Sequence, residues 1–145
     1  MRLIEQCAEA LGRMLLQRQA GRLEPALQTL REAELQLLGS LQPVVERLEA
    51  ASAVSVAGAD LMRLYAGLIG EEGLLHQTCG DTAQAYLACR RAAELYAAVS
   101  LARCRLDDAD LGRVGLLATV VALDDLGSPY AAELGRLRRQ ASSPP

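Results

Sequence analysis

The sequence contains no lysine, asparagine, phenylalanine or tryptophan, and it has a single histidine. Without lysine, the chain cannot form a Schiff base with a carbonyl substrate, and it cannot supply the lysine of a phosphate-binding P-loop. The G-x-S-x-G motif of serine hydrolases and the H-E-x-x-H motif of zinc proteases are also absent. These absences remove the common routes to catalysis, so we expect no enzyme activity, no catalytic residue and no cofactor.

The chain also lacks the close cysteine and histidine pairs that hold zinc. Its cysteines are Cys7, Cys79, Cys89 and Cys104, which form no C-x-x-C pair, and His76 is the only imidazole. We therefore expect no metal site and interpret the cysteines as buried, reduced thiols, because cysteine is often buried in cores.

Long apolar runs are missing too. The most apolar stretch, Val114 to Leu123, spans 10 residues, whereas about 20 are needed to cross a bilayer. The charged segment Met1 to Gln6 does not resemble a signal peptide. The net charge of −3 is unfavourable for neutralising nucleic-acid phosphates. We expect a soluble, cytoplasmic protein that binds neither membranes nor nucleic acid.

Leucine and alanine make up much of the chain, with 28 and 25 residues out of 145. This composition favours helices, and the length is that of one domain. Apolar residues recur at spacings of three and four, as in Ile4, Cys7 and Leu11. We predict an all-α fold: one domain over residues 1–140, with about six to seven helices in antiparallel hairpins around 3–38, 59–105 and 108–140, then a disordered tail over 141–145.

Capping residues and breaks set the predicted helix ends. The helices are predicted at Leu3–Gln19, Leu23–Leu38, Pro43–Ala50, Ala59–Cys79, Thr82–Arg105, Asp108–Leu126 and Tyr130–Gln140, and 51–58 is predicted to be a loop. Asp81 and Asp107 are natural N-caps for the helices that follow them. Gly67, Gly70 and Gly73 recur every three residues, which predicts close helix packing on that face.

The sequence partly repeats itself. A shift of 59 residues places Gly21 on Gly80, Ala26 on Ala85 and Ala33 on Ala92, and a further shift of 47 places Gly80 on Gly127. Each unit reads as a helix, a glycine turn and a second helix with small residues. Such a pair cannot bury its own apolar face and needs a neighbour.

The segment Gly80-Asp81-Thr82-x2-Ala85-x3-Cys89-x2-Ala92 resembles the second half of a tetratricopeptide (TPR) unit, and Gly73 falls where the first helix of that unit has a small residue. Leu23-x2-Ala26-x3-Leu30-x2-Ala33 is a weaker copy. Glu72 stands where the repeat has an apolar residue, and the spacing differs from the repeat's, so a regular array is not expected.

Residues 3–96 also resemble a family of short bacterial helical proteins of unknown function. The shared pattern comprises an N-terminal amphipathic helix, a Gly21-x3-Pro25-Ala26-Leu27 stretch, and a segment from Glu71-Glu72-Gly73 to Gly80-Asp81. This resemblance carries no activity with it.

The TPR-like resemblance implies a TPR-like scaffold or adaptor that binds a protein or peptide. The partner-binding surface would carry Leu11, Leu15, Arg18, Leu74 and Gln77. Two alternatives stay open. The apolar helices could instead pair with a second copy in a structural homo-oligomer such as a homodimer. Alternatively, His76 and Cys79 could serve a small-ligand binder or an enzyme as a thiol–imidazole pair, although the plainer interpretation of His76 is a partly exposed helical histidine.

Overall fold

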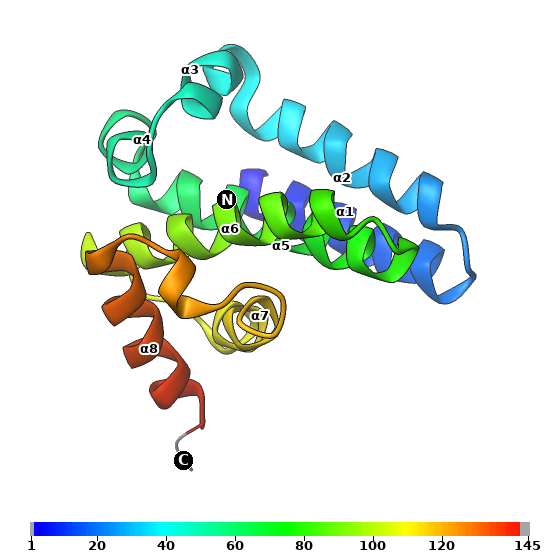
Figure 1. Cartoon of the computed structure of the whole chain (residues 1–145). Helices are drawn as coiled ribbons and strands as arrows, with labels where there is room; N and C mark the ends of the chain where they lie inside the picture. The colour runs from blue at the N-terminus through cyan, green and yellow to red at the C-terminus, as the bar shows by residue number, and fades with distance from the viewer. Residues whose placement is uncertain (1, 143–145) are drawn as a thin grey trace.

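The computed structural model describes residues 2–142, which form helices joined by short connections (Figure 1). No strand occurs in this part of the chain, so the all-α prediction is confirmed. The α-helices are α1 (Arg2–Gln19), α2 (Leu23–Leu38), α3 (Gln42–Arg47), α4 (Ala50–Ala57), α5 (Ala59–Cys79), α6 (Thr82–Leu101), α7 (Asp108–Leu117) and α8 (Ser128–Ser142). Short 3-10 helices, η1 (Gly39–Leu41) and η2 (Leu123–Asp125), lie in two connections.

Helices α5 and α6 form the central hairpin, with α2 on one side and α7 and α8 on the other (Figure 1). The Asp81 carboxylate caps α6 by accepting a hydrogen bond from the Gln84 backbone N–H at 3.2 Å, as predicted. Gly73 of α5 lies directly against Cys89 of α6, where a Cβ atom would stand 2.6 Å from the cysteine sulfur and 2.9 Å from its backbone nitrogen. The predicted close packing at Gly73 is therefore confirmed.

Helices α1 and α2 form a second hairpin that packs on α5. The turn passes through Gly21, whose φ of +76° glycine adopts without strain. The Thr29 hydroxyl of α2 donates a hydrogen bond to the Gln17 side chain of α1 at 2.8 Å. Met14, Leu30 and Leu68, one from each of these three helices, are fully buried in the core.

The predicted loop over 51–58 is wrong, because residues 50–57 form α4. The Glu49 carboxylate caps this helix by accepting from the Ser52 backbone N–H. Tyr130 of α8 adds a second cap, since its hydroxyl donates to Glu49 and accepts from the Ala51 backbone N–H at 3.0 Å. The helix thus depends partly on a residue 79 positions away, which local propensity does not reveal.

The predicted end of α6 is also wrong. The helix stops at Leu101 rather than near Arg105, because Arg103 turns the chain in the left-handed conformation, with φ +65°. The Cys104 backbone N–H then donates to the Val99 carbonyl at 3.2 Å, which closes the helix end. Asp107 starts α7 with a reciprocal capping box, in which its carboxylate accepts from the Asp110 N–H and the Asp110 carboxylate accepts from the Asp107 N–H.

Helix α7 ends at Leu117, nine residues before the predicted end at Leu126. The Thr119 hydroxyl donates to the Leu116 carbonyl at 2.6 Å, which competes with continuation of the helix. The β-branched pair Val120 and Val121 follows, and Val121 is buried in a turn rather than on a helix. In the predicted tail 141–145, residues 141 and 142 belong to α8, and residues 143–145 lie outside the described residues.

All four cysteines are free thiols, and they differ in burial. Cys7 and Cys89 are buried as predicted, and burial raises the pKa of the Cys89 thiol to about 11. Cys79 is exposed and Cys104 is half-buried, so for these two the prediction of burial is wrong. The reason is position, because Cys79 is the last residue of α5 and Cys104 lies in the connection after α6. None of the described helices combines the length and apolar character required to cross a membrane.

Gly73→Ala tests the contact between α5 and α6. The added methyl group meets the backbone of Cys89, which cannot rotate away, so we expect the free energy of unfolding to fall by about 1–3 kcal/mol. Gly12→Ala is the matched control, because its Cβ would meet nothing within 4 Å, and it should stabilise α1 by up to about 1 kcal/mol. Urea unfolding followed by circular dichroism measures both, and equal effects would contradict the assigned packing.

Candidate functional site

Six charged side chains form one alternating chain across α1, α5 and the start of α7, which we call the charge chain. Its members, in order, are Arg18, Glu71, Arg113, Asp110, Arg63 and Asp107. Successive members are separated by 2.7 to 3.9 Å between nitrogen and oxygen. Three arginines alternate with three carboxylates, so the charges balance without an external ion.

The centre of the charge chain is accommodated by two glycines of α5. A Cβ atom at Gly67 would lie 3.3 Å from Arg113 Nη1, and one at Gly70 would lie 3.1 Å from Arg113 Cδ. At Gly67 and Gly70, the group that packs closely against α5 is therefore the long Arg113 side chain of α7. Arg113 consequently crosses α5 and reaches Glu71 at 3.0 Å.

Tyr96 of α6 also belongs to this network. Its hydroxyl donates to Asp110 Oδ1 at 3.1 Å and accepts from Arg113 Nη1 at 2.9 Å. Burial raises the pKa of the Tyr96 hydroxyl, so it keeps its proton at neutral pH. Although burial by itself lowers the pKa of Arg113, Tyr96 and Glu71 raise it above its ordinary value. Tyr96 therefore stays neutral and Arg113 stays charged, and together they fix α7 on the central hairpin.

A cavity of about 160 Å³ opens beside this network, between α1, α5 and α7. Ile4, Ala8 and Leu11 of α1 line one wall, and Arg63, Asp110 and Arg113 line the other. A second cavity of about 480 Å³ shares Arg63 and Asp107 with the first, and continues along the connection between α6 and α7. The two cavities thus meet at the N-terminus of α7.

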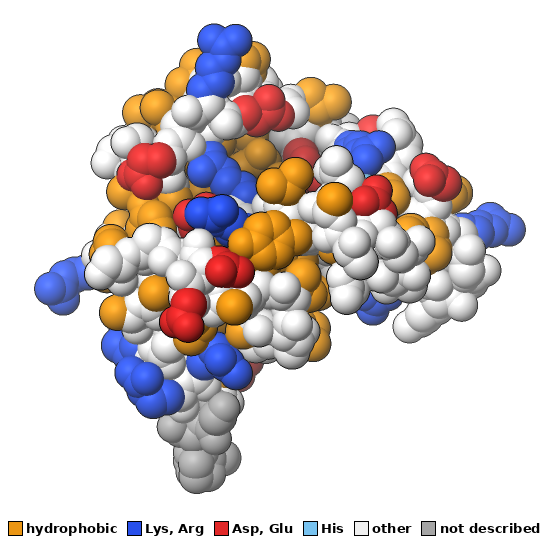
Figure 2. Space-filling model, in the orientation of Figure 1, with side chains coloured by type: hydrophobic (Ala, Val, Ile, Leu, Met, Phe, Trp, Pro, Cys, Tyr) orange, Lys and Arg blue, Asp and Glu red, His pale blue; other side chains and the backbone are white. Residues whose placement is uncertain are grey.

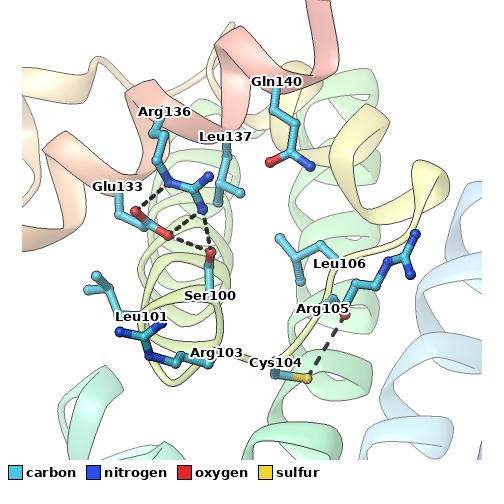
Figure 3. Close-up of a pocket in the computed structure, with 10 residues that line it drawn as sticks. All are labelled: Ser100, Leu101, Arg103, Cys104, Arg105, Leu106, Glu133, Arg136, Leu137 and Gln140. Atoms are coloured by element: carbon cyan, nitrogen blue, oxygen red, sulfur yellow. Dashed lines mark hydrogen bonds and ion pairs between the residues drawn. The ribbon is translucent and has the colours of Figure 1, made fainter. Parts of the chain in front are cut away.

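A third cavity, of about 500 Å³, shares Cys104, Arg105, Leu106 and Gln140 with the second (Figure 3). Figure 3 shows Arg136 of α8 reaching Ser100 of α6, with Gln140 of α8 lining the same cavity. The Ser100 hydroxyl donates to Glu133 and accepts from Arg136 at 3.1 Å, and Arg136 also bonds Glu133 at 2.8 Å. We call these three neighbouring cavities, which share lining residues, the α7 groove.

The two ends of the α7 groove differ in character. The α1 end is apolar, and Ile4 there is 49% exposed. At the α8 end, Arg136 is paired with Glu133, whereas Arg103 and Arg105 make no ion pair with any residue between 2 and 142. Blue side chains also gather over α8 in Figure 2. Between the ends, Asp60 and Asp108 line the second cavity. The groove thus offers an apolar surface, an acidic centre and a positively charged end.

The structure places the five predicted partner-binding residues differently. Leu11 lines the α7 groove, and Arg18 belongs to the charge chain beside it. Leu15 lies one turn beyond Leu11 and is exposed, whereas Leu74 is half-buried and Gln77 is exposed on α5. Leu15, Leu74 and Gln77 line none of the three cavities.

Sequence reasoning missed the residues that shape the groove most, namely Arg63, Tyr96 and Arg113. The glycine spacing in α5 pointed to a close approach there, but it did not show that an arginine from α7 is the approaching group. Arg113 is 42 residues from Glu71 in the sequence, so no local pattern connects them.

The structure places His76 and Cys79 in different surroundings. His76 is 8% exposed, which contradicts the expected partial exposure, whereas Cys79 lies on the surface. Within the described residues, no hydrogen bond joins them. In the same part of the chain, no group of three or more histidine, cysteine, aspartate or glutamate side chains is placed to hold a metal ion.

No protein-family model matches the chain, and no match was found among curated proteins or solved structures. The geometry of the α7 groove is therefore the basis for assigning a function.

Tyr96→Phe tests the network that supports the groove. The substitution removes one hydroxyl and leaves Asp110 and Arg113 each short of a buried partner, so the free energy of unfolding should fall by about 1–3 kcal/mol. Tyr86→Phe is the control, because that hydroxyl donates to Asp125 at the surface, and the expected loss is below about 0.5 kcal/mol. Thermal and urea unfolding measure the difference. A Tyr96→Phe loss no larger than that of Tyr86→Phe would contradict the role given to Tyr96.

Proposed function

We propose that the protein is a non-catalytic interaction module that binds a peptide segment of a partner protein in the α7 groove. The observation that carries this proposal is the succession of three neighbouring cavities, which share lining residues from the α1 end to the α8 end. An extended or short helical peptide fits such a groove better than a compact metabolite does.

The chemistry of the two ends defines the peptide further. The exposed Ile4 and its neighbours favour an apolar side chain at the α1 end. Arg103 and Arg105, which lack ion pairs within residues 2–142, favour a carboxylate at the α8 end. The preferred ligand is thus a peptide that carries an apolar anchor and an acidic residue.

The charge chain supports binding by holding the groove walls in place. Because α1, α5, α6 and α7 are all tied to it, directly or through Tyr96, the walls lose little conformational freedom when a peptide enters. The conformational entropy of the groove walls is therefore lost when the protein folds, and little more is lost when the peptide binds.

The TPR-like resemblance is part of the same proposal. In the TPR-like pattern, Gly73 is the small residue of the first helix and Cys89 belongs to the second helix. The close contact between these two residues supports the resemblance. Bacterial origin, membership of the short helical family and a cytoplasmic location also belong to this proposal.

Self-association is a second candidate function, and one observation favours it. Helix α1 exposes four large apolar side chains, namely Leu3, Ile4, Leu15 and Leu16. A second copy could cover them in a symmetric homodimer. Light scattering distinguishes the candidates, because a mass of two chains for the free protein favours self-association.

Ile4→Glu tests the apolar end of the groove. Peptides are first selected from a displayed random library on the purified protein, and one is then titrated by fluorescence anisotropy. A carboxylate at residue 4 opposes burial of the peptide's apolar anchor, so we expect affinity to fall at least about tenfold. Leu16→Glu is the matched control, because Leu16 is 69% exposed on the same helix and lines none of the three cavities. Failure to select any peptide, or an equal loss in both variants, would overturn the proposed binding site.

Arg105→Glu tests the charged end in the same titration. We expect the affinity for an acidic peptide to fall at least about tenfold and its dependence on salt to weaken. Arg138→Glu is the matched control, because it makes the same change of charge. Arg138 is exposed on α8 and lines none of the groove cavities, so the effect on affinity should be small. Similar losses in the two variants would show that net charge, rather than the groove, determines binding.

A further inference from the structure

Glu34 of α2 has a buried carboxyl group that faces α5, and Glu34 does not line the α7 groove. Glu34 of α2 is only 7% exposed. Its Oε2 atom is buried and has no hydrogen-bond partner within residues 2–142. An ionised carboxylate in this position would lose its hydration without a replacement, which is strongly unfavourable.

Most of the nearest charged groups are negative. Glu72 of α5 is the closest in effect, because after burial its charge raises the pKa of Glu34 the most, and it is itself largely buried, with a side-chain exposure of 15%. Glu46 of α3 contributes a further negative charge to the site. The cation facing the pair on α2, Arg31, lies 3.6 Å from Glu72 and is half exposed.

The remaining titratable groups around the pair do not replace this missing positive charge. Tyr65 of α5 is buried, and burial raises the pKa of its hydroxyl, so it stays neutral. Arg91 of α6 directs its guanidinium to the Val45 carbonyl, at 2.8 Å. His76 is buried one turn beyond Glu72 on α5.

We propose that Glu34 and Glu72 share one proton and form a proton-dependent latch between α2 and α5. In the closed latch, the Glu34 carboxyl O–H donates to the Glu72 carboxylate, so the pair carries one negative charge, which faces Arg31. When the Glu34 O–H bond breaks, the proton passes to solvent and two adjacent carboxylates remain. Their repulsion opposes the contact of the α1–α2 hairpin with α5.

The direction of the pH effect follows from proton counting. Burial, followed by the charge of Glu72, raises the pKa of Glu34 to about 9. The unfolded chain loses this proton near the ordinary value of 4.5, whereas the folded chain retains it. Stability from the latch is therefore fully present below pH 4.5 and is lost progressively as the pH rises toward 9.

Glu34→Gln provides the first test, because glutamine keeps the shape and the donor but cannot ionise. We expect the unfolding equilibrium constant of the wild type to rise at least about tenfold more than that of the variant between pH 5 and pH 9. Glu32→Gln, on the exposed face of the same helix, should follow the wild type. An identical pH dependence in the wild type and Glu34→Gln would overturn the latch.

Carbon-detected NMR titration of the glutamate carboxyl groups in the wild-type protein provides a test that does not depend on a variant folding. We expect Glu34 to titrate well above pH 7, and to titrate at lower pH in Glu72→Gln, which removes the neighbouring charge. Titration of Glu34 near its ordinary value of 4.5 would overturn the proposal. A high midpoint that is unchanged in Glu72→Gln would assign the effect to burial alone and overturn the shared proton.

Discussion

Arg113 is the residue on which the arrangement around α7 depends. Its side chain is largely buried, with an exposure of 13%, and a charge in such a position requires matched partners. Those partners come from α5, α6 and α7 itself, in the form of Glu71, Tyr96 and Asp110. Because α7 has only 10 residues and a small apolar face, this polar anchor fixes a helix that packing alone would hold weakly. Arg113 and its partner Asp110 also line the first cavity of the α7 groove, opposite α1.

The two faces of α5 differ in whether their buried charges are paired with opposite charges. On the α7 face, three arginines and three carboxylates alternate, and each charge has a partner. On the α2 face, Glu34 and Glu72 meet with only one half-exposed arginine nearby. The first face is therefore balanced in charge, whereas the second retains a proton that the unfolded chain releases. One helix thus combines a rigid polar support with a titratable contact.

Local sequence signals predicted the helices whose ends are set locally. The predicted bounds of Ala59–Cys79 match α5 because Gly58 and Gly80 interrupt the chain on either side, and Asp81 and Asp107 cap as expected. The errors fall where distant contacts decide, as in α4, which Tyr130 helps to cap. The same limit applies to the site, because glycine spacing indicated a close approach to α5 without identifying Arg113. A pattern on one helix does not name the side chain that another helix supplies.

The cap of α4 by Tyr130 has a consequence for the order of events during synthesis. The hydroxyl that completes the start of α4 belongs to a residue added 79 positions after Ala51. While the ribosome is producing the intervening helices, α4 has its Glu49 cap but not the tyrosine contact. The corner formed by α3 and α4 therefore reaches its final stability only after α8 has left the exit tunnel.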